Sequence, residues 1–270
     1  MQHYTEEFYK YLQNSSRESA KEIIPILWEF LQPKTVIDVG CGTGTWLAEF
    51  KELGVEYILG IEGDWVDLEM LEIPADKFLA FDLNQPVQID QKFDLVISLE
   101  VAEHLPPERA KIFVNSLVNL GPVILFSAAV PLQGGTNHLN EQWPDYWAKL
   151  FQEQGYTAID CVRPKIWQND KVKWYYAQNI LIFAEREYLA TNRDLQKQAD
   201  RTNICQLSLI HPQLYLRTAS EAIKLKQEIA EILELKDPRI SLKKMLFYLP
   251  TLTKERLSRK MKQLLKQNYK

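Results

Sequence analysis

"VIDVGCGTGTWL", from Val36 to Leu47, is the segment most informative about the fold. An apolar run typical of a buried strand leads into three alternating glycines, and a helical pattern follows them. Glycines accept a positive φ and let the backbone approach a ligand closely. The start of a helix offers free N–H groups to an anionic group. The stretch therefore predicts a strand, a ligand-binding loop and a helix in direct succession.

The same alternation of apolar runs and helical segments continues outward from this stretch. We expect strands at residues 35–39, 57–61, 78–81, 93–99, 123–127, 156–161 and 178–184. Near-continuous apolar strands separated by helices are typical of a parallel sheet covered on both faces. The predicted fold is α/β, with a Rossmann-like, doubly wound, mostly parallel sheet of seven strands. The last two strands have no clear helix between them, so we expect them to form an antiparallel pair at one edge.

Helical segments flank the predicted sheet on both sides in the sequence. Residues 1–32 are expected to form a helical segment of two short helices, the second capped by Ser19, and to serve either as a lid or as simple packing. Residues 33–187 hold the sheet. Residues 188–270 are expected to form a helical extension, with an amphipathic helix at 219–235 and a basic tail from Ser241. This extension could contact a second copy of the chain or a fused or partner biosynthetic domain.

Composition restricts the function further. The chain has 270 residues and a formal net charge of −4, which disfavours nucleic acid as a partner. Three distant cysteines predict a reducing compartment, with neither a disulfide framework nor a zinc site. The first residues lack the pattern of a signal peptide, and the longest apolar stretch, "PVILFSAAVPL", is too short to span a bilayer. We therefore expect a cytoplasmic protein without a membrane span.

The spacing of the glycines argues against one common ligand of such loops. A dinucleotide site requires G-x-G-x-x-G, and Thr45 occupies the position of the third glycine of that pattern. Acidic residues stand instead at three strand ends: Asp38 just before the loop, Glu62 after the second strand and Asp82 after the third. An acid at the place of Glu62 is suited to binding ribose hydroxyls.

Four pieces of the sequence together resemble the class I S-adenosylmethionine-dependent methyltransferases. They are "VIDVGCGTGTWL", "ILGIEGDW", "FLAFDLNQP" and "FDLVISLEVAEHLPPE", and the resemblance covers residues 35–185. The wider sequence is similar to bacterial methyltransferases of natural-product and polysaccharide pathways. The resemblance implies S-adenosylmethionine as methyl donor and S-adenosylhomocysteine as product. It also implies a set of cofactor-binding residues: Asp38 at the amino end, Gly40, Gly42 and Gly44 along the methionine part, Glu62 on the ribose, Gly63, Asp64 and Trp65 beside the adenosine, Asp82 and Leu83 at the adenine, and Leu99 and Glu100 beneath the sulfonium.

Two further stretches follow predicted strands and are candidates for the acceptor side. They are "EVAEHLPPE" and "GGTNHLNEQWPDYW". An acceptor oxygen must lose its proton near the time of attack, and a histidine is suited to take it near neutral pH. His138 is the first candidate for this base, and His104 is the second. Glu103 completes the candidate catalytic set.

Three functions remain open on these grounds. The first is methylation of a hydroxyl or carboxylate on a small molecule, such as a natural product, peptide or sugar, with His138 as base or positioner. The second follows from Glu-x-x-Glu-His and a later histidine, which resemble the metal site of small-RNA 3′-end 2′-O-methyltransferases. In that case Glu100, Glu103, His104 and His138 would hold magnesium or manganese. The same motif also fits a metal-free role, in which Glu103 and His104 cap a helix or pack under the cofactor. The third is a cofactor-binding scaffold without catalysis that acts through its C-terminal helices.

Overall fold

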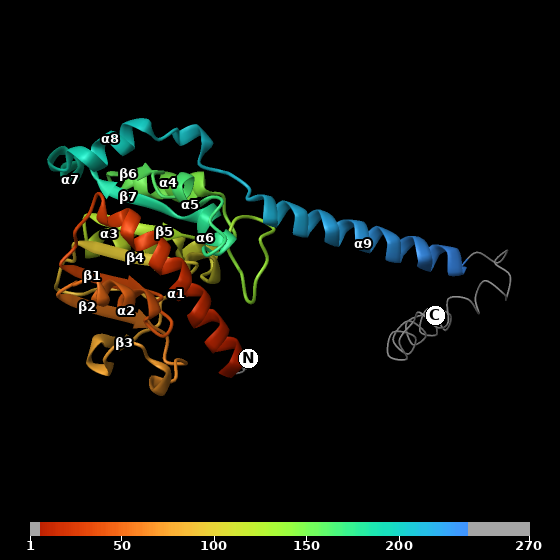
Figure 1. Cartoon of the computed structure of the whole chain (residues 1–270), viewed down its shortest axis with the longest axis horizontal. Helices are drawn as coiled ribbons and strands as arrows, with labels where there is room; N and C mark the ends of the chain where they lie inside the picture. Colours follow the sequence, from red (N-terminus) through yellow and green to blue (C-terminus); the bar gives the residue numbers. More distant parts are fainter. Residues whose placement is uncertain (1–5, 237–270) are drawn as a thin grey trace. The chain divides into compact units, whose positions relative to one another are not determined.

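One seven-stranded sheet forms the centre of the protein in this computed structural model, which describes residues 6–236 and, for side chains, residues 13–231 (Figure 1). The strand order is β3-β2-β1-β4-β5-β7-β6. Strands β1 to β5 pair in parallel, whereas β7 runs antiparallel to both β5 and β6. The predicted mostly parallel sheet with an antiparallel edge pair is thereby confirmed. The strands are β1 Thr35–Val39, β2 Tyr57–Glu62, β3 Phe78–Ala80, β4 Leu95–Leu99, β5 Val123–Ser127, β6 Tyr156–Ile159 and β7 Leu181–Glu185.

Helices cover both faces of this sheet, as a doubly wound fold requires (Figure 1). Successive strand residues point to opposite faces, so Val36 belongs to one apolar core and Ile37 to the other. Side chains of α1, α2 and α5 to α8 join the first core, and those of α3 and α4 join the second. The helices are α1 Glu6–Trp28, α2 Thr45–Glu52, α3 Ala110–Leu120, α4 Pro144–Glu153, α5 Arg163–Ile166, α6 Trp174–Asn179, α7 Arg186–Thr191, α8 Arg193–Arg201 and α9 Pro212–Lys236.

The parallel strands β1, β2, β4 and β5 all end at the same edge of the sheet. Their last residues are Val39, Glu62, Leu99 and Ser127. In open α/β sheets, ligands bind beyond the carboxyl ends of the strands. The loops that follow these four strands therefore define the edge at which a site is expected.

The structure corrects two predictions of local structure. The N-terminal segment is the single helix α1 rather than two short ones, and Ser19 lies inside it, where its hydroxyl donates to the carbonyl oxygen of Ser15 (2.9 Å) instead of capping a helix. The last strand begins at Leu181 rather than at 178. Gln178 and Asn179 end α6 because their carboxamides bond within a buried polar cluster that a strand register would break.

The compact unit that contains the sheet comprises residues 1–214, and a second unit comprises 215–270. Helices α7 and α8 belong to the first unit because Leu189 and Leu195 are buried in its core. A helix was expected at 219–235, and α9 spans that range from an earlier start at Pro212. The basic tail from Ser241 lies outside the described residues. Within residues 6–236, no helix has the length and apolar character needed to cross a membrane.

Candidate functional site

The loop between β1 and α2 requires its glycines for two different reasons. Gly40, Gly42 and Gly44 all have a positive φ, of 91°, 54° and 84°, which residues with a side chain rarely adopt. At Gly40 a Cβ would also lie 2.3 Å from Cγ2 of Val101, which follows β4. At Gly42 a Cβ would meet nothing within 4 Å, so that side of the loop is open. The bare backbone predicted to line the cofactor is therefore present, and one glycine faces open space.

Glu62 ends β2 and reaches back to this loop. Its Oε2 accepts a hydrogen bond from the Gly42 amide (3.1 Å), and its Oε1 accepts one from the Gly63 amide (2.8 Å). Asp38 lies beside Glu62, buried in β1. Burial raises the pKa of both carboxyl groups, and the Glu62 charge adds to the effect on the pKa of Asp38. A buried and a half-buried acid next to an open glycine loop suit a ligand that brings a cation and hydroxyl donors.

The other residues predicted to contact the adenosine divide into buried and exposed positions. Trp65 is 65% exposed, and its ring lies so close to Gly63 that a Cβ there would be 2.0 Å from it. Leu83 is buried. Asp82 is exposed, and its carboxylate accepts bonds from the backbone and side chain of Asn84 within its own turn, which lowers its pKa. Their contacts to an adenosine remain predictions.

Helix α1 contacts the glycine loop, which the sequence pattern did not reveal. The Gln13 carboxamide donates to the Thr43 hydroxyl and to the Met70 carbonyl oxygen, at 3.1 Å each. Arg17 pairs with Glu49 of α2 (2.9 Å) and with Glu72. An isolated glutamine and arginine on a helix carry no motif, so only the fold brings them to this loop. A lid role for α1 remains a prediction.

Glu100 begins the loop after β4 and has an unusual backbone conformation. Its φ is +55°, and its amide donates to both the carbonyl oxygen and the hydroxyl of Ser127 (3.0 and 3.1 Å). Its carboxylate accepts from the Gln133 and Asn179 carboxamides, at 2.9 and 3.1 Å. Burial raises the pKa of Glu100, and the amide donors oppose that shift. Neutral donors therefore already occupy the carboxylate that the sequence proposed as a metal ligand.

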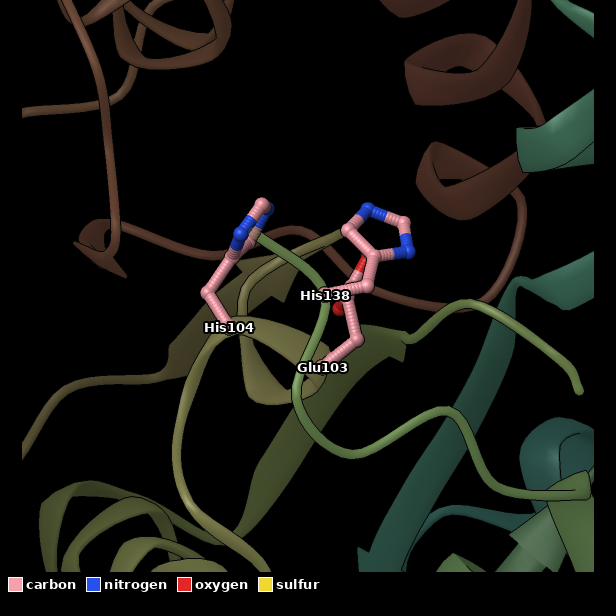
Figure 2. Close-up of side chains that lie close together, drawn as sticks. All are labelled: Glu103, His104 and His138. Carbon is pink, nitrogen blue, oxygen red and sulfur yellow. The ribbon is translucent and has the colours of Figure 1, made fainter. Parts of the chain in front are cut away.

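Glu103, His104 and His138 do come together at the same edge (Figure 2). One potential ligand atom from each lies within 4.8 Å of the others. The rings of His104 and His138 are perpendicular, with centroids 4.9 Å apart. Burial and the neighbouring His138 lower the pKa of His104. The structure thus brings both candidate histidines together with Glu103.

Glu103 is the most constrained member of this group. It is fully buried, and neither of its side-chain oxygens has a hydrogen-bond partner among the described residues. Burial raises its pKa well above the ordinary value and the charge of Glu100 adds to that shift, whereas the backbone amides of Glu103 and Ala129 oppose it. Its own carbonyl oxygen accepts from the amides of Leu139 and Asn140 (2.7 and 2.9 Å), which joins the loops after β4 and β5.

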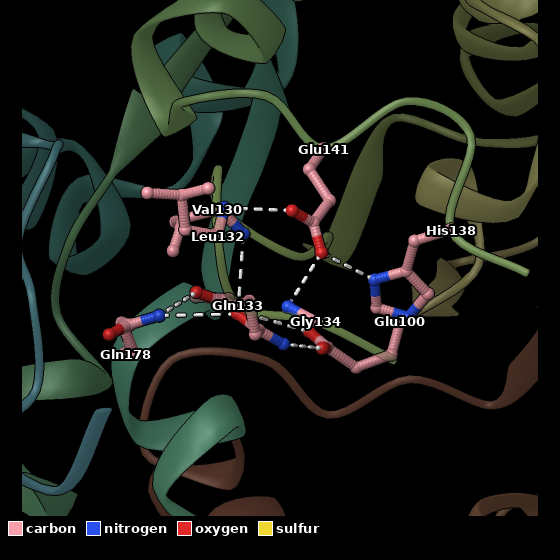
Figure 3. A network of polar contacts seen from close by, with 9 residues as sticks. Glu100, Val130, Leu132, Gln133, Gly134, His138, Glu141 and Gln178 are labelled. Atoms are coloured by element: carbon pink, nitrogen blue, oxygen red, sulfur yellow. Dashed lines mark hydrogen bonds and ion pairs between the residues drawn. The ribbon is translucent and has the colours of Figure 1, made fainter. Parts of the chain in front are cut away.

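A buried cluster of carboxamides completes the acceptor side and was missed in the sequence (Figure 3). Oε1 of Gln133 accepts from Gln178 (3.2 Å) and Asn179 (2.9 Å), while its Nε2 donates to Glu100. The Gln178 oxygen accepts from the amide of His211 (2.8 Å). Buried amides of this kind leave no sequence motif, because the partners come from four separate segments. The sequence also assigned no role to Glu141, although its Oε1 atom lies 2.8 Å from Nδ1 of His138.

Comparisons with known proteins give one family-model match and several solved structures of similar fold. A family model described as a methyltransferase domain matches residues 8–164. Among solved structures, a methyltransferase in complex with the Trm112 activator of Haloferax volcanii has a TM-score of 0.50 and 14% identity, over 66% of this chain and 92% of that chain. The methyltransferase domain of the bacterial protein CtHen1 has 0.48 and 19%, over 64% and 99%. Magnesium protoporphyrin IX methyltransferase from Synechocystis PCC 6803 has 0.44 and 20%, over 63% and 84%.

At these identities the structural likeness concerns the fold alone, and no curated protein matches the chain. The family model, however, covers more than half of the 270 residues, including the glycine loop, both acids beside it and the two candidate histidines. The chain belongs to the methyltransferase domain family and is a class I methyltransferase that uses S-adenosylmethionine.

Proposed function

We propose that this enzyme methylates an oxygen atom of a small molecule, with a neutral hydroxyl as the acceptor group. The observation that carries the proposal is the position of His138, on the loop after β5 and beside His104. This is the same sheet edge at which the glycine loop and Glu62 are found. A histidine there can take the proton that a hydroxyl loses on attack.

The charges of the two acceptor-side segments favour a hydroxyl over a carboxylate or a phosphodiester. Residues 100–108 and 128–148 contain no lysine or arginine, but they contain five acids: Glu100, Glu103, Glu108, Glu141 and Asp145. Anionic groups are normally bound by arginine, lysine or backbone amides. A carboxylate acceptor or an RNA backbone would find no cation on either segment, whereas an uncharged hydroxyl requires none.

The residues of the chain would divide the work between two sides. When bound, S-adenosylmethionine supplies an electrophilic methyl group on a sulfonium. The glycine loop, Asp38 and Glu62 would hold the donor through backbone approach, charge and hydroxyl contacts. His138 would hold the acceptor hydroxyl and accept its proton, and loops around the site would exclude water. Holding the two reactants at near-attack distance supplies much of the acceleration in such transfers.

The proposal is tested by radiolabelled methyl transfer to a panel of hydroxyl-bearing acceptors, with matched carboxylate analogues. We expect hydroxyl acceptors to be preferred. His138→Ala should lower turnover by about a hundredfold or more, in the range of general-base contributions. S-adenosylhomocysteine affinity, measured by calorimetry, should change little because His138 lies on the acceptor side. Full activity of His138→Ala with the preferred acceptor would rule out the base assignment.

A divalent cation at Glu103, His104 and His138 is a second candidate, favoured by one specific observation. A fully buried carboxylate without hydrogen-bond partners is costly, and a bound cation would compensate it. One carboxylate with two imidazoles suits manganese better than magnesium, which prefers oxygen ligands. Such a cation could bind a vicinal diol, as in a sugar or an RNA 3′ end. The acidic segments described above count against RNA.

This candidate is tested by titrating manganese and magnesium into the S-adenosylhomocysteine complex by calorimetry. Saturable binding that is lost in His138→Ala would support the cation site and direct the acceptor search to vicinal diols. Absence of binding would leave His138 as a metal-free base. Glu100→Gln serves as a control, because Glu100 is bound by carboxamides and should not contribute to cation affinity.

A further inference from the structure

Glu141 uses both of its carboxylate oxygens within its own loop (Figure 3). Oε2 accepts from the amide of Leu132 (2.8 Å), and Oε1 accepts from the amide of Gly134 (2.8 Å). The same Oε1 lies 2.8 Å from Nδ1 of His138. Both side chains are largely sheltered, with 13% of His138 and 19% of Glu141 exposed. One carboxylate therefore ties two backbone amides and the candidate base together.

The backbone of this loop requires such a tie. Leu132 has a φ of +68° and Asn137 one of +60°, although neither is a glycine. A left-handed conformation is unfavourable for a residue with a side chain, and asparagine tolerates it better than leucine. The side chain of Leu132 is also 79% exposed, so burial of its side chain does not offset that cost. The bonds from Leu132 and Gly134 to Glu141 stabilise a conformation that the chain alone disfavours.

The contact also decides where the proton sits on the His138 ring. An ionised carboxylate can only accept hydrogen bonds, so at 2.8 Å the Nδ1 atom must carry the hydrogen. Neutral His138 is then protonated at Nδ1 and has a free lone pair at Nε2. The ring is seated closely on Gly135, where a Cβ would lie 2.1 Å from Nε2. The orientation and the tautomer of the ring are thus both fixed by its own loop.

We propose that Glu141 is the positioning residue of the acceptor side: it folds the loop after β5 and holds His138 in the Nδ1–H tautomer, with Nε2 ready to accept a proton. The inference rests on the proposed role of His138 as base. In the transfer, the acceptor O–H proton passes to Nε2 as the oxygen forms its bond to the methyl carbon. The carbon–sulfur bond breaks with its electron pair left on sulfur, and the Glu141 carboxylate keeps its charge beside the imidazolium. A carboxylate that orients a histidine by hydrogen bonding to its other nitrogen is a recurrent device.

The test is nitrogen NMR of histidine-labelled protein in complex with S-adenosylhomocysteine, because the nitrogen shifts separate the two tautomers without any acceptor. His138→Gln assigns the signal. We expect the Nδ1–H tautomer in the wild type, its loss in Glu141→Ala and a reduced population in Glu141→Gln, which keeps the side-chain volume. Glu108→Gln, at an exposed acid of the short turn Pro107–Arg109 before α3, is the matched control and should leave the His138 tautomer unchanged.

Two results would overturn the inference: an Nε2–H tautomer of His138 in the wild type, or an unchanged Nδ1–H signal in both Glu141 variants. S-adenosylhomocysteine calorimetry on each variant reports whether the cofactor side remains folded. Failure of this inference and failure of the proposed function are distinguishable. If Glu141 controls the tautomer but His138→Ala transfers methyl groups normally, the base assignment fails and the positioning role stands. If His138→Ala is inactive but the His138 tautomer is the same in the wild type and in both Glu141 variants, only the positioning role fails.

Discussion

The cofactor side and the acceptor side of this site are built from different parts of the chain. On the cofactor side, the backbone forms the ligand-facing surface. Gly40 and Gly42 have a positive φ, which favours glycine, and Glu62 binds two backbone amides. On the acceptor side, side chains do the same work, with Glu100 and Gln133 joined by carboxamide contacts. A backbone requirement leaves a fixed pattern in the sequence, whereas a side-chain requirement can be met in many ways. The difference explains why the sequence names the methyl donor and not the acceptor.

The largest effect on cofactor binding is expected from a methyl group added to the glycine loop. In Gly40→Ala the new Cβ would meet Val101 at 2.3 Å, at a residue with φ of +91°. Overpacking of this kind costs about 1–3 kcal/mol, beyond the cost of the backbone conformation. The loop must move to relieve this contact, and binding must then restore its position. We therefore expect S-adenosylhomocysteine affinity to fall by about a hundredfold or more, since each 1.4 kcal/mol is a factor of ten. Calorimetry measures it.

Gly54 provides the matched control for that substitution. Its φ is +96°, but a Cβ there would meet nothing within 4 Å, and it ends α2 away from the loop. Gly54→Ala should lower the free energy of unfolding by about 1–2 kcal/mol through conformation alone. Its affinity for S-adenosylhomocysteine should be that of the wild type. Equal affinity losses in the two variants would contradict a loop shaped by close backbone approach.

The next largest effect on cofactor affinity is expected from two acids at or just after the ends of neighbouring strands. Glu62 is half-buried and bonded to the loop, whereas Asp82 is exposed and bonded to its own turn. Glu62→Ala should weaken S-adenosylhomocysteine binding by about ten- to a thousandfold, because two charge-assisted bonds to hydroxyls are lost. Asp82→Asn should weaken it by less than about tenfold, as expected for an exposed group. Calorimetry of both variants decides, and unchanged binding in Glu62→Ala would remove the ribose assignment.

On the acceptor side, replacing the buried Gln133 should lower the free energy of unfolding more than replacing Gln142 of the same loop. Gln133→Leu removes a donor to Glu100 and an acceptor for Gln178 and Asn179. Leaving such buried groups without partners costs about 1–3 kcal/mol in the free energy of unfolding. Gln142→Leu is the control in the same loop, because its carboxamide bonds only to the neighbouring Asn140 among the contacts described. Urea denaturation compares them, and equal losses would mean that the carboxamide cluster does not hold the acceptor side.

The same division explains how much the sequence could predict. The sheet, its antiparallel edge and the loop glycines followed from apolar runs and from Gly-x-Gly-x-Gly, because each is a local demand on the backbone. His104 and His138 were found because histidines are few and these two follow strands. Their closeness also depends on Glu103, whose carbonyl oxygen binds the amides of the loop after β5. That contact is between backbones far apart in the sequence and has no local signal.

The errors have the same origin. Ser19 has the pattern of a helix cap, yet its hydroxyl bonds back into α1 and accepts from the Lys173 amide (3.1 Å) at the start of α6. Residues Gln178 and Asn179 extend an apolar strand pattern, yet their carboxamides find partners on Glu100 and Gln133. In both cases a tertiary contact overrides a local preference. Tertiary contacts of polar side chains are therefore the part of this molecule that a single sequence leaves open.

The smallest effect, and the sharpest test of the cofactor side, is the dependence of stability on pH. Because burial raises the pKa of Asp38 and Glu62 in the folded protein, the native state holds protons that the unfolded chain releases above about pH 4. The free energy of unfolding of the cofactor-free enzyme should therefore fall as the pH rises from that point toward the raised pKa values, by at most about 1.4 kcal/mol per pH unit for each group. Urea denaturation at a series of pH values measures this slope. Asp38→Asn should make it less steep, while Glu100 and Glu103, whose pKa values burial also raises, keep contributing in the same direction. Asp82→Asn should leave it unchanged, because the pKa of Asp82 is lowered and its contribution is complete at lower pH. A slope as steep in Asp38→Asn and in Glu62→Gln as in the wild type would place its whole origin at Glu100, Glu103 or other groups, and the two acids of the cofactor side would then not hold protons in the absence of a cationic ligand.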